Sequence, residues 1–201
     1  MMTPKLGTAA PEFQGIKAWI NSEPINLAGL RGKVAFLDFW TYSCANCVRT
    51  LPHVKGLNDR YSSDGLVVIG IHTPEFPFER DPSRVANAVE KAGLRYPIAL
   101  DSDNSTWKLY GNHYWPRQTL VDVKGVIGYE LIGEGDYDEI ERKVKELLKE
   151  IKSLNKFSQN ERKAGPVGFE PMVSEASASA PKADALIRAR LRARKRCDRS
   201  G

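Results

Sequence analysis

The chain has 201 residues, of which 41% are hydrophobic and 27% charged, with three cysteines and a formal net charge of +5. This length suits one domain of common size plus an appendage, and three unevenly placed cysteines exclude a disulfide-stapled secreted scaffold. Residues 153–201 hold 11 Lys and Arg against 5 Asp and Glu, so the basic charge gives no indication of a nucleic-acid surface on the preceding domain.

The first part of the chain predicts an entry segment followed by a buried strand. Residues 1–32 are rich in turns and contain one short amphipathic piece at Ile16–Ile20. Val34–Trp40 is a continuous apolar run interrupted only by Asp38. Such a run is typical of a central strand that is buried on both faces of an α/β sheet.

A helix is expected to begin at Cys44, with Ser43 as its N-cap. Apolar residues recur at three- and four-residue spacing as far as Tyr61, and Pro52 should kink the helix. Further elements are expected in chain order, two of them paired as a hairpin and the last an amphipathic helix: strand Leu66–Ile71, loop His72–Phe78, a helix from Asp81 to Gly93, strand Tyr96–Leu100, a short helix at Ser105–Tyr110, strands Gln118–Val123 and Val126–Ile132, and helix Asp136–Ile151.

These elements predict a central mixed sheet flanked by helices in one domain over residues 1–152. Residues 153–201 are rich in Ser, Ala, Pro and charge, which predicts a disordered tail, with a basic helix possible only near its end. This tail is interpreted either as an electrostatic tether or as a read-through extension without function, because Val167–Pro171 resembles translation through a neighbouring tRNA gene.

The spacing of Cys44 and Cys47 points to disulfide exchange. A helix N-terminus favours a thiolate on the first cysteine, and one helical turn brings the second beside it to attack a mixed disulfide. The alternative is half of a zinc site, but only Cys197 and three histidines remain to complete four ligands. We therefore expect neither a metal nor a cofactor.

Several motifs in the same order resemble one family. They are the segment Asp38–Cys47 (DFWTYSCANC), Glu12–Trp19, Gly70–Phe76 and Tyr114–Pro116. Residues 12–150 are similar in these features to the TlpA/ResA-like redoxins, and most of all to the C-terminal thioredoxin domain of DipZ-type proteins. The resemblance implies a thioredoxin-like fold and a thiol–disulfide oxidoreductase, with Cys44 as nucleophile and Cys47 as resolving cysteine.

The resemblance also implies roles for four further residues. Asp38 would be the buried acid that accepts the proton of the resolving cysteine, and Trp40 the active-site tryptophan. Pro116 would be a cis-proline packed against the cysteines, and Glu75 an acid near them. The alternatives are an Asp bonded to the backbone, a core Trp, a trans-proline at a sheet edge and a solvated Glu.

The resemblance implies cysteine-containing protein partners, while the electron donor stays unidentified because no flavin or nicotinamide fingerprint is present. We expect a monomer. Ala45 and Asn46 replace the Gly-Pro of thioredoxins, so the direction of electron flow stays open. Two other functions share part of this pattern. A peroxiredoxin-type thiol peroxidase would share Thr41 and Cys44, but its site carries a proline at the position of Leu37. A Sco-like copper carrier would bind the metal through two cysteines separated by three residues, whereas two residues separate Cys44 and Cys47.

The sequence contains no apolar run of about 18 residues, so no membrane-spanning helix is expected. Residues 1–25 lack the apolar stretch of a signal peptide. As written, the chain is therefore expected in the cytoplasm. An extracytoplasmic location would follow if an upstream signal or anchor is missing from the sequence.

Overall fold

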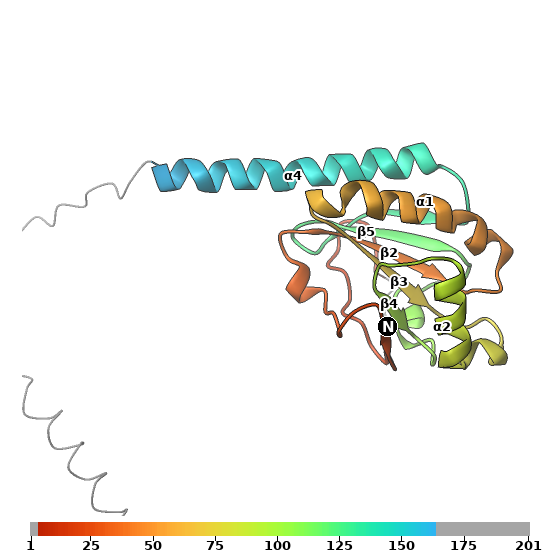
Figure 1. Ribbon diagram of the computed structural model, residues 1–201. Coiled ribbons are helices and arrows are strands. Elements are labelled where there is room, and N and C mark those ends of the chain that lie inside the picture. The colour runs from red at the N-terminus through yellow and green to blue at the C-terminus, as the bar shows by residue number, and fades with distance from the viewer. Residues whose placement is uncertain (1–3, 164–201) are drawn as a thin grey trace, which may run out of the picture. The chain divides into compact units, whose positions relative to one another are not determined.

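The computed structural model describes residues 4–163, with their side chains as far as residue 153 (Figure 1). A six-stranded sheet lies at its centre, in the order β1-β4-β3-β2-β5-β6. The strands are β1 (Trp19–Ile20), β2 (Val34–Trp40), β3 (Leu66–His72), β4 (Ile98–Leu100), β5 (Arg117–Val121) and β6 (Ile127–Ile132). Strands β2, β3 and β4 are parallel, and the other three pair antiparallel. The prediction of a mixed sheet is confirmed.

Strand β2 is the middle of the sheet, and all seven of its residues are buried. It pairs with β3 on one side and β5 on the other, which aligns Asp38 with Gly70 and with Gln118. Because both faces are covered, the strand needs apolar residues at every position rather than at alternate ones. The one exception, Asp38, therefore lies in the interior of the protein.

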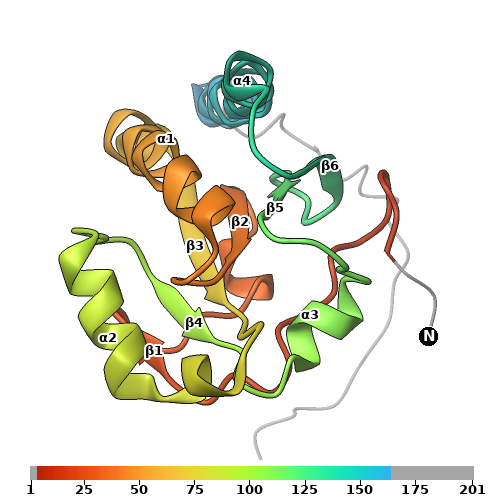
Figure 2. The same ribbon diagram turned by 90° about the vertical axis from the view of Figure 1, so that its right-hand side faces the viewer.

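Helices cover both faces of the sheet. Helices α1 (Ala45–Tyr61), α2 (Pro82–Lys91) and α4 (Tyr137–Lys163) bury apolar side chains in one cluster, and α3 (Ser105–Leu109) contributes to a second cluster with residues that precede β2. Figure 2 shows α1 and α2 on one side of strands β2–β4 and α3 on the other. This three-layer arrangement places the first turn of α1 directly after the carboxyl end of β2.

Three differences from the sequence-based expectations are larger than a shift of a strand end by one or two residues. The N-cap of α1 is Cys44 and not Ser43, because the Cys44 sulfur accepts the hydrogen bond of the first helical turn. Helix α4 continues to Lys163 instead of ending at Ile151, so it includes the start of the expected tail. The short strand β1 replaces the amphipathic piece, because Trp19 pairs with Ala99. The rest of the expected tail, residues 164–201, lies outside the described residues.

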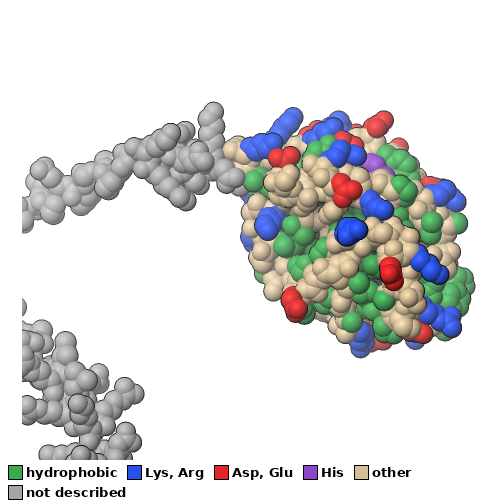
Figure 3. Space-filling model, in the orientation of Figure 1, with side chains coloured by type: hydrophobic (Ala, Val, Ile, Leu, Met, Phe, Trp, Pro, Cys, Tyr) green, Lys and Arg blue, Asp and Glu red, His purple; other side chains and the backbone are tan. Residues whose placement is uncertain are grey.

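Charges of both signs are interspersed on the face of the domain that Figure 3 shows. On the face drawn in Figure 3, Lys and Arg side chains alternate with Asp and Glu and form no continuous basic stripe. Among the helices of residues 4–163, none is both long and apolar enough to cross a membrane.

Candidate functional site

The two cysteines lie at the start of α1, on the loop that leaves the carboxyl end of β2. Cys44 is the N-cap in an extended conformation, and its Sγ accepts a hydrogen bond from the backbone N–H of Cys47 at 3.4 Å. Cys44 is half-buried and Cys47 fully buried, and both are free thiols. The helix N-terminus thus directs an N–H group at the outer sulfur, where it stabilises negative charge.

The inner cysteine is held as a thiol. Burial raises the pKa of Cys47 far above its ordinary value, and its contact with Cys44 adds to the effect. A thiol in that state is a poor nucleophile, because only the thiolate attacks a disulfide. Cys47 therefore needs a base nearby before it can react.

Asp38 is the candidate base. Its carboxylate is fully buried, and neither oxygen has a hydrogen-bond partner among the described residues. Burial raises the pKa of Asp38 to about 7, although the Gln118 side chain on the adjacent strand has a smaller opposing effect. The charge of Asp38 in turn raises the pKa of Cys47, so the two groups lie within electrostatic reach of each other. A carboxyl that titrates near neutral pH is suited to accept and return a proton.

Other polar groups without partners share this interior region. Among the described residues, the Trp40 indole nitrogen, the Tyr96 hydroxyl and the Gln118 amide are buried without hydrogen bonds. The pKa of Tyr96 is raised by burial and by the charge of Asp38. Gly70 makes room here, because a Cβ at this position would lie 2.6 Å from Ile98 Cδ1 and 3.0 Å from the Trp40 nitrogen. Trp40 itself is 1% exposed and is part of the core.

The loop before β5 completes the wall beside Cys44. The Trp115–Pro116 peptide bond is cis, and the carbonyl oxygen of Trp115 lies 4.0 Å from the Cys44 sulfur. The Trp115 ring stacks on Trp107 with centroids 3.9 Å apart, and its indole N–H donates to the Thr73 carbonyl at 3.1 Å. The loop is therefore fixed from two sides next to the outer cysteine.

The residues 41–44, between the end of β2 and the start of α1, are called the cysteine loop. The acid that contacts this loop is Glu79, which was not among the residues predicted from the sequence. It is fully buried and accepts the hydroxyls of Thr41 and Ser43, each at 2.5 Å, and the backbone N–H groups of Glu75 and Phe76. Burial opposes ionisation, but these four donors outweigh it and lower the pKa of Glu79. Glu75, the residue selected from the sequence, has an exposed side chain.

His72 is a structural neighbour of this network. Burial lowers its pKa to about 4, so the ring is neutral at ordinary pH. The Tyr42 ring stacks on the His72 ring with centroids 5.5 Å apart. The Nε2 atom of His72 lies 3.4 Å from the Thr41 hydroxyl. His53 is half-buried and stacks on Tyr137.

The candidate site residues from the sequence thus fall into two groups. Cys44, Cys47, Asp38 and Pro116 come together at the start of α1, whereas Trp40 lies in the core beside them and Glu75 on the surface. Within residues 4–163, no group of three or more His, Cys, Asp or Glu side chains is placed to hold a metal ion.

Comparison with known proteins identifies the family of the chain. Residues 5–148 match the family model described as Redoxin. Over 153 residues the chain is 46% identical to the protein DipZ of Mycobacterium tuberculosis, covering 75% of this chain but only 22% of DipZ. It is 29% identical to the thiol–disulfide oxidoreductase YkuV of Bacillus subtilis, covering 73% of this chain and 98% of YkuV.

A solved structure shows the same fold. A thioredoxin-like protein determined in solution in its oxidised form superposes with a TM-score of 0.66 at 30% identity, covering 73% of this chain and 98% of that protein. The predictions of a thioredoxin-like fold and of a resemblance to redoxins are therefore confirmed, and the name of YkuV is that of the activity expected for this chain.

Proposed function

The chain belongs to the Redoxin family, and from this premise we propose that it exchanges disulfides with protein thiols through Cys44 and Cys47. One observation carries the proposal: the outer sulfur caps α1, and the inner thiol is buried within reach of a carboxyl whose pKa is about 7. That arrangement supplies a nucleophile, a resolving thiol and a proton acceptor from a single chain. We propose a monomer as the working unit for the same reason.

The first step is attack by the Cys44 thiolate on one sulfur of a substrate disulfide. A new S–S bond joins Cys44 to that sulfur, and the substrate S–S bond breaks. The electron pair leaves on the second substrate sulfur, which takes a proton from water. The N–H of Cys47 supports the attacking sulfur from the helix side.

The second step releases the substrate. Cys47 gives its proton to the Asp38 carboxylate and attacks the Cys44 sulfur. The Cys44–Cys47 disulfide forms, the bond between Cys44 and the first substrate sulfur breaks, and that sulfur leaves as a thiolate. The substrate gains two electrons, and the pair loses two. A dithiol donor restores the pair by the same steps in reverse, with Asp38 returning its proton to Cys47.

Pro116 and its neighbours form the wall on which the substrate would rest. The Trp115 carbonyl faces the Cys44 sulfur, and the stack on Trp107 holds the loop in place. An extended partner chain lying there would present its sulfur to Cys44 in line for attack. Trp40 supports the site by packing. Glu75 stays a lesser candidate, limited to contact with a bound partner.

We further propose that the chain acts as a reductant, in keeping with the cytoplasmic location expected from its sequence. The check is the reduction potential of the Cys44–Cys47 couple in the full chain, equilibrated against glutathione. A value near about −270 mV supports a reductase, and one near about −120 mV would identify an oxidant.

The division of labour between the cysteines is tested with two variants. Cys44→Ser should abolish reduction of insulin disulfides. Cys47→Ser should still attack but fail to release its substrate, so a covalent complex with a cysteine-containing protein accumulates and is seen by mass spectrometry. Val48→Ser in the same helical turn, a residue with 48% exposure, is the matched control and should keep full activity. Full activity in Cys44→Ser would disprove the proposal.

A further inference from the structure

A groove opens beside the cysteine loop. It has a volume of about 410 Å³ and is lined by side chains from the cysteine loop, the turn after β3 and one face of α2: Tyr42, Phe78, Arg84, Asn87, Ala88 and Lys91. We call it the α2 groove. Tyr42 is two residues from Cys44, so at most about 7 Å of chain separates the groove from the nucleophile.

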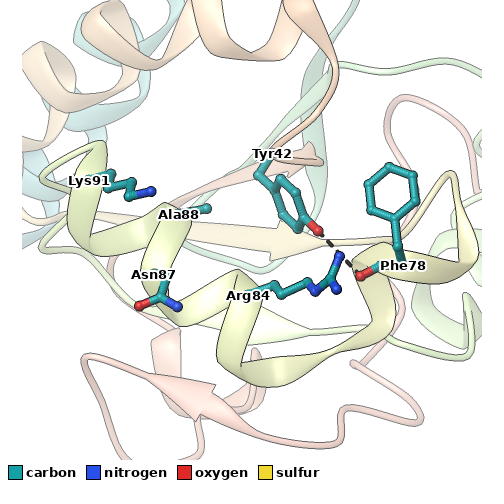
Figure 4. Close-up of a pocket in the computed structure, with 6 residues that line it drawn as sticks. All are labelled: Tyr42, Phe78, Arg84, Asn87, Ala88 and Lys91. Atoms are coloured by element: carbon teal, nitrogen blue, oxygen red, sulfur yellow. Dashed lines mark hydrogen bonds between the residues drawn. The ribbon is translucent and has the colours of Figure 1, made fainter.

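The floor of the α2 groove is apolar and held in place. Phe78 is 47% exposed, and its ring lies 6.4 Å from that of Tyr42, whose hydroxyl donates to the Phe78 carbonyl at 3.3 Å (Figure 4). Phe76, 46% exposed, stacks on Phe78 with centroids 5.6 Å apart. The buried Glu79 anchors the turn that carries both rings. Exposed aromatic rings on a fixed turn are typical of a binding surface, because little entropy is lost on contact.

The rim of the α2 groove is basic. Arg84 and Lys91 lie two turns apart on the same face of α2, and Figure 4 shows both extending from the helix along the groove. Lys91 has no ion pair among the described residues, and Arg84 has only an exposed contact with Asp81 at 3.6 Å. Such a contact contributes little, so both cations are available to a ligand. Seven helical residues separate them by about 10 Å, which about three residues of extended chain span.

We propose that the α2 groove binds the segment of a protein substrate next to its disulfide, and selects one with a large apolar side chain flanked by carboxylates about three residues apart. The apolar side chain packs against the rings of Tyr42 and Phe78, and the carboxylates meet Arg84 and Lys91. This inference rests on the proposed function and names the substrate class of the same site. The charge complementarity of the rim favours an acidic partner over a neutral one.

The experiment compares two synthetic peptides, each with one internal disulfide. Both carry Phe beside a cysteine, flanked by two Asp in one peptide and by two Lys in the other. The second-order rate of oxidation of the reduced full chain is followed by chromatography of the peptide thiols. We expect at least about tenfold preference for the acidic peptide at low ionic strength, falling to about twofold or less in about 0.5 M salt, because screening weakens exposed charge pairs. Equal rates at low salt would overturn the inference.

Three variants locate the effect. Arg84→Glu with Lys91→Glu should reverse the preference, whereas Lys124→Glu with Lys149→Glu, which changes the same charge at exposed positions elsewhere, should preserve it. Phe78→Ala should slow the acidic peptide about fivefold, but not a peptide with Ala in place of Phe. If the double variant at Lys124 and Lys149 also loses the preference for the acidic peptide, the net charge of the protein causes the preference, and the inference about the α2 groove is wrong.

Two further readouts separate this inference from the proposed function and from a small ligand. Exchange with the neutral hydroxyethyl disulfide should be unchanged in every groove variant. A wild-type chain that fails even this exchange would contradict the proposed function itself. If instead oxidised glutathione is as sensitive to reversal of Arg84 and Lys91 as the acidic peptide, the groove takes a small anionic disulfide and the protein partner is excluded.

Discussion

The Asp38 carboxyl is ionisable, fully buried and without a hydrogen-bond partner among the described residues. Its pKa is raised to about 7 from 3.8. The native protein therefore keeps this proton up to about neutral pH, while the unfolded chain loses it above about pH 4. The free energy of unfolding must therefore fall as the pH rises from about 4 to about 7, because the unfolded state binds fewer protons than the native state in this range.

Asp38→Asn should remove that loss. At pH 8 we expect the variant to be more stable than the wild type by up to about 4 kcal/mol, which is the shift of about 3 pKa units converted at 1.36 kcal/mol each. Below pH 4 the two proteins should differ little. Urea unfolding of the reduced proteins from pH 4 to 8 is the measurement. Asp59→Asn, at an exposed position, is the control and should show no such trend.

The same variant should be slower in catalysis while being more stable. Without the carboxylate, Cys47 has no proton acceptor, and loss of a general base typically costs about a hundredfold or more. Release from the mixed disulfide should slow, whereas its formation by Cys44 should not. An Asp38→Asn protein with unchanged release and a flat stability profile would show that Asp38 is only a buried structural group.

The turn between β3 and α2 is an element that one side chain holds together. Glu79 accepts two hydroxyls from the cysteine loop and two N–H groups of its own turn. Its pKa is lowered by these donors, so its contribution to stability is present above about pH 4.5 and is lost as the pH falls through its lower native value. The turn and the cysteine loop are thus one unit.

Glu79→Ala should destabilise the protein by about 2–4 kcal/mol at pH 7, because it leaves a buried hydroxyl and two amides without an acceptor. Glu79→Gln should lose no more than about 1 kcal/mol, since the hydroxyls can reverse and accept from its amide. The matched control is Glu75→Ala on the same turn, where the exposed side chain should cost about 0.5 kcal/mol or less. Thermal unfolding compares the three, and similar losses at positions 75 and 79 would contradict this account.

Elements set by local pattern were predictable from the sequence, and those set by distant contacts were not. The apolar run of β2 and the spacing of α1 identify both elements because burial dictates every position. Strand β1 has two residues and exists only because it pairs with β4, which comes about 80 positions later in the chain. Glu79 was missed for the same reason, since its hydroxyl partners lie on another loop.

The cis bond before Pro116 was expected from family resemblance and not from local chemistry, because most X–Pro bonds in folded proteins are trans. The positions of Cys44, Cys47 and Asp38 followed from a strand, a loop and a helix in order. Cys44 as the cap did not follow, because serine is the commoner choice at that position.

At the scale of the whole molecule, the apolar core uses only part of the chain. The two apolar clusters of the described residues include nothing before Ala10 or after Ile151. We propose that residues 1–152 form the working domain, with α4 extending beyond it. A chain that stops after Lys163 should keep its melting temperature within about 4 °C, because a change below about 1 kcal/mol shifts it no further at this size. Its rate of exchange with hydroxyethyl disulfide should also be unchanged. A large loss in either would place part of the domain in residues 164–201.

The sulfur that caps α1 is also the atom that reacts. The backbone N–H of Cys47 donates its hydrogen bond to Cys44 Sγ. A change in the charge or bonding of that sulfur therefore changes the hydrogen bond of the Cys47 amide. Nitrogen-15 labelling would turn that amide into a resident reporter. Its resonance should move in separate steps as the sulfur passes from thiolate to mixed disulfide to internal disulfide, so that turnover becomes visible spectroscopically without any added dye.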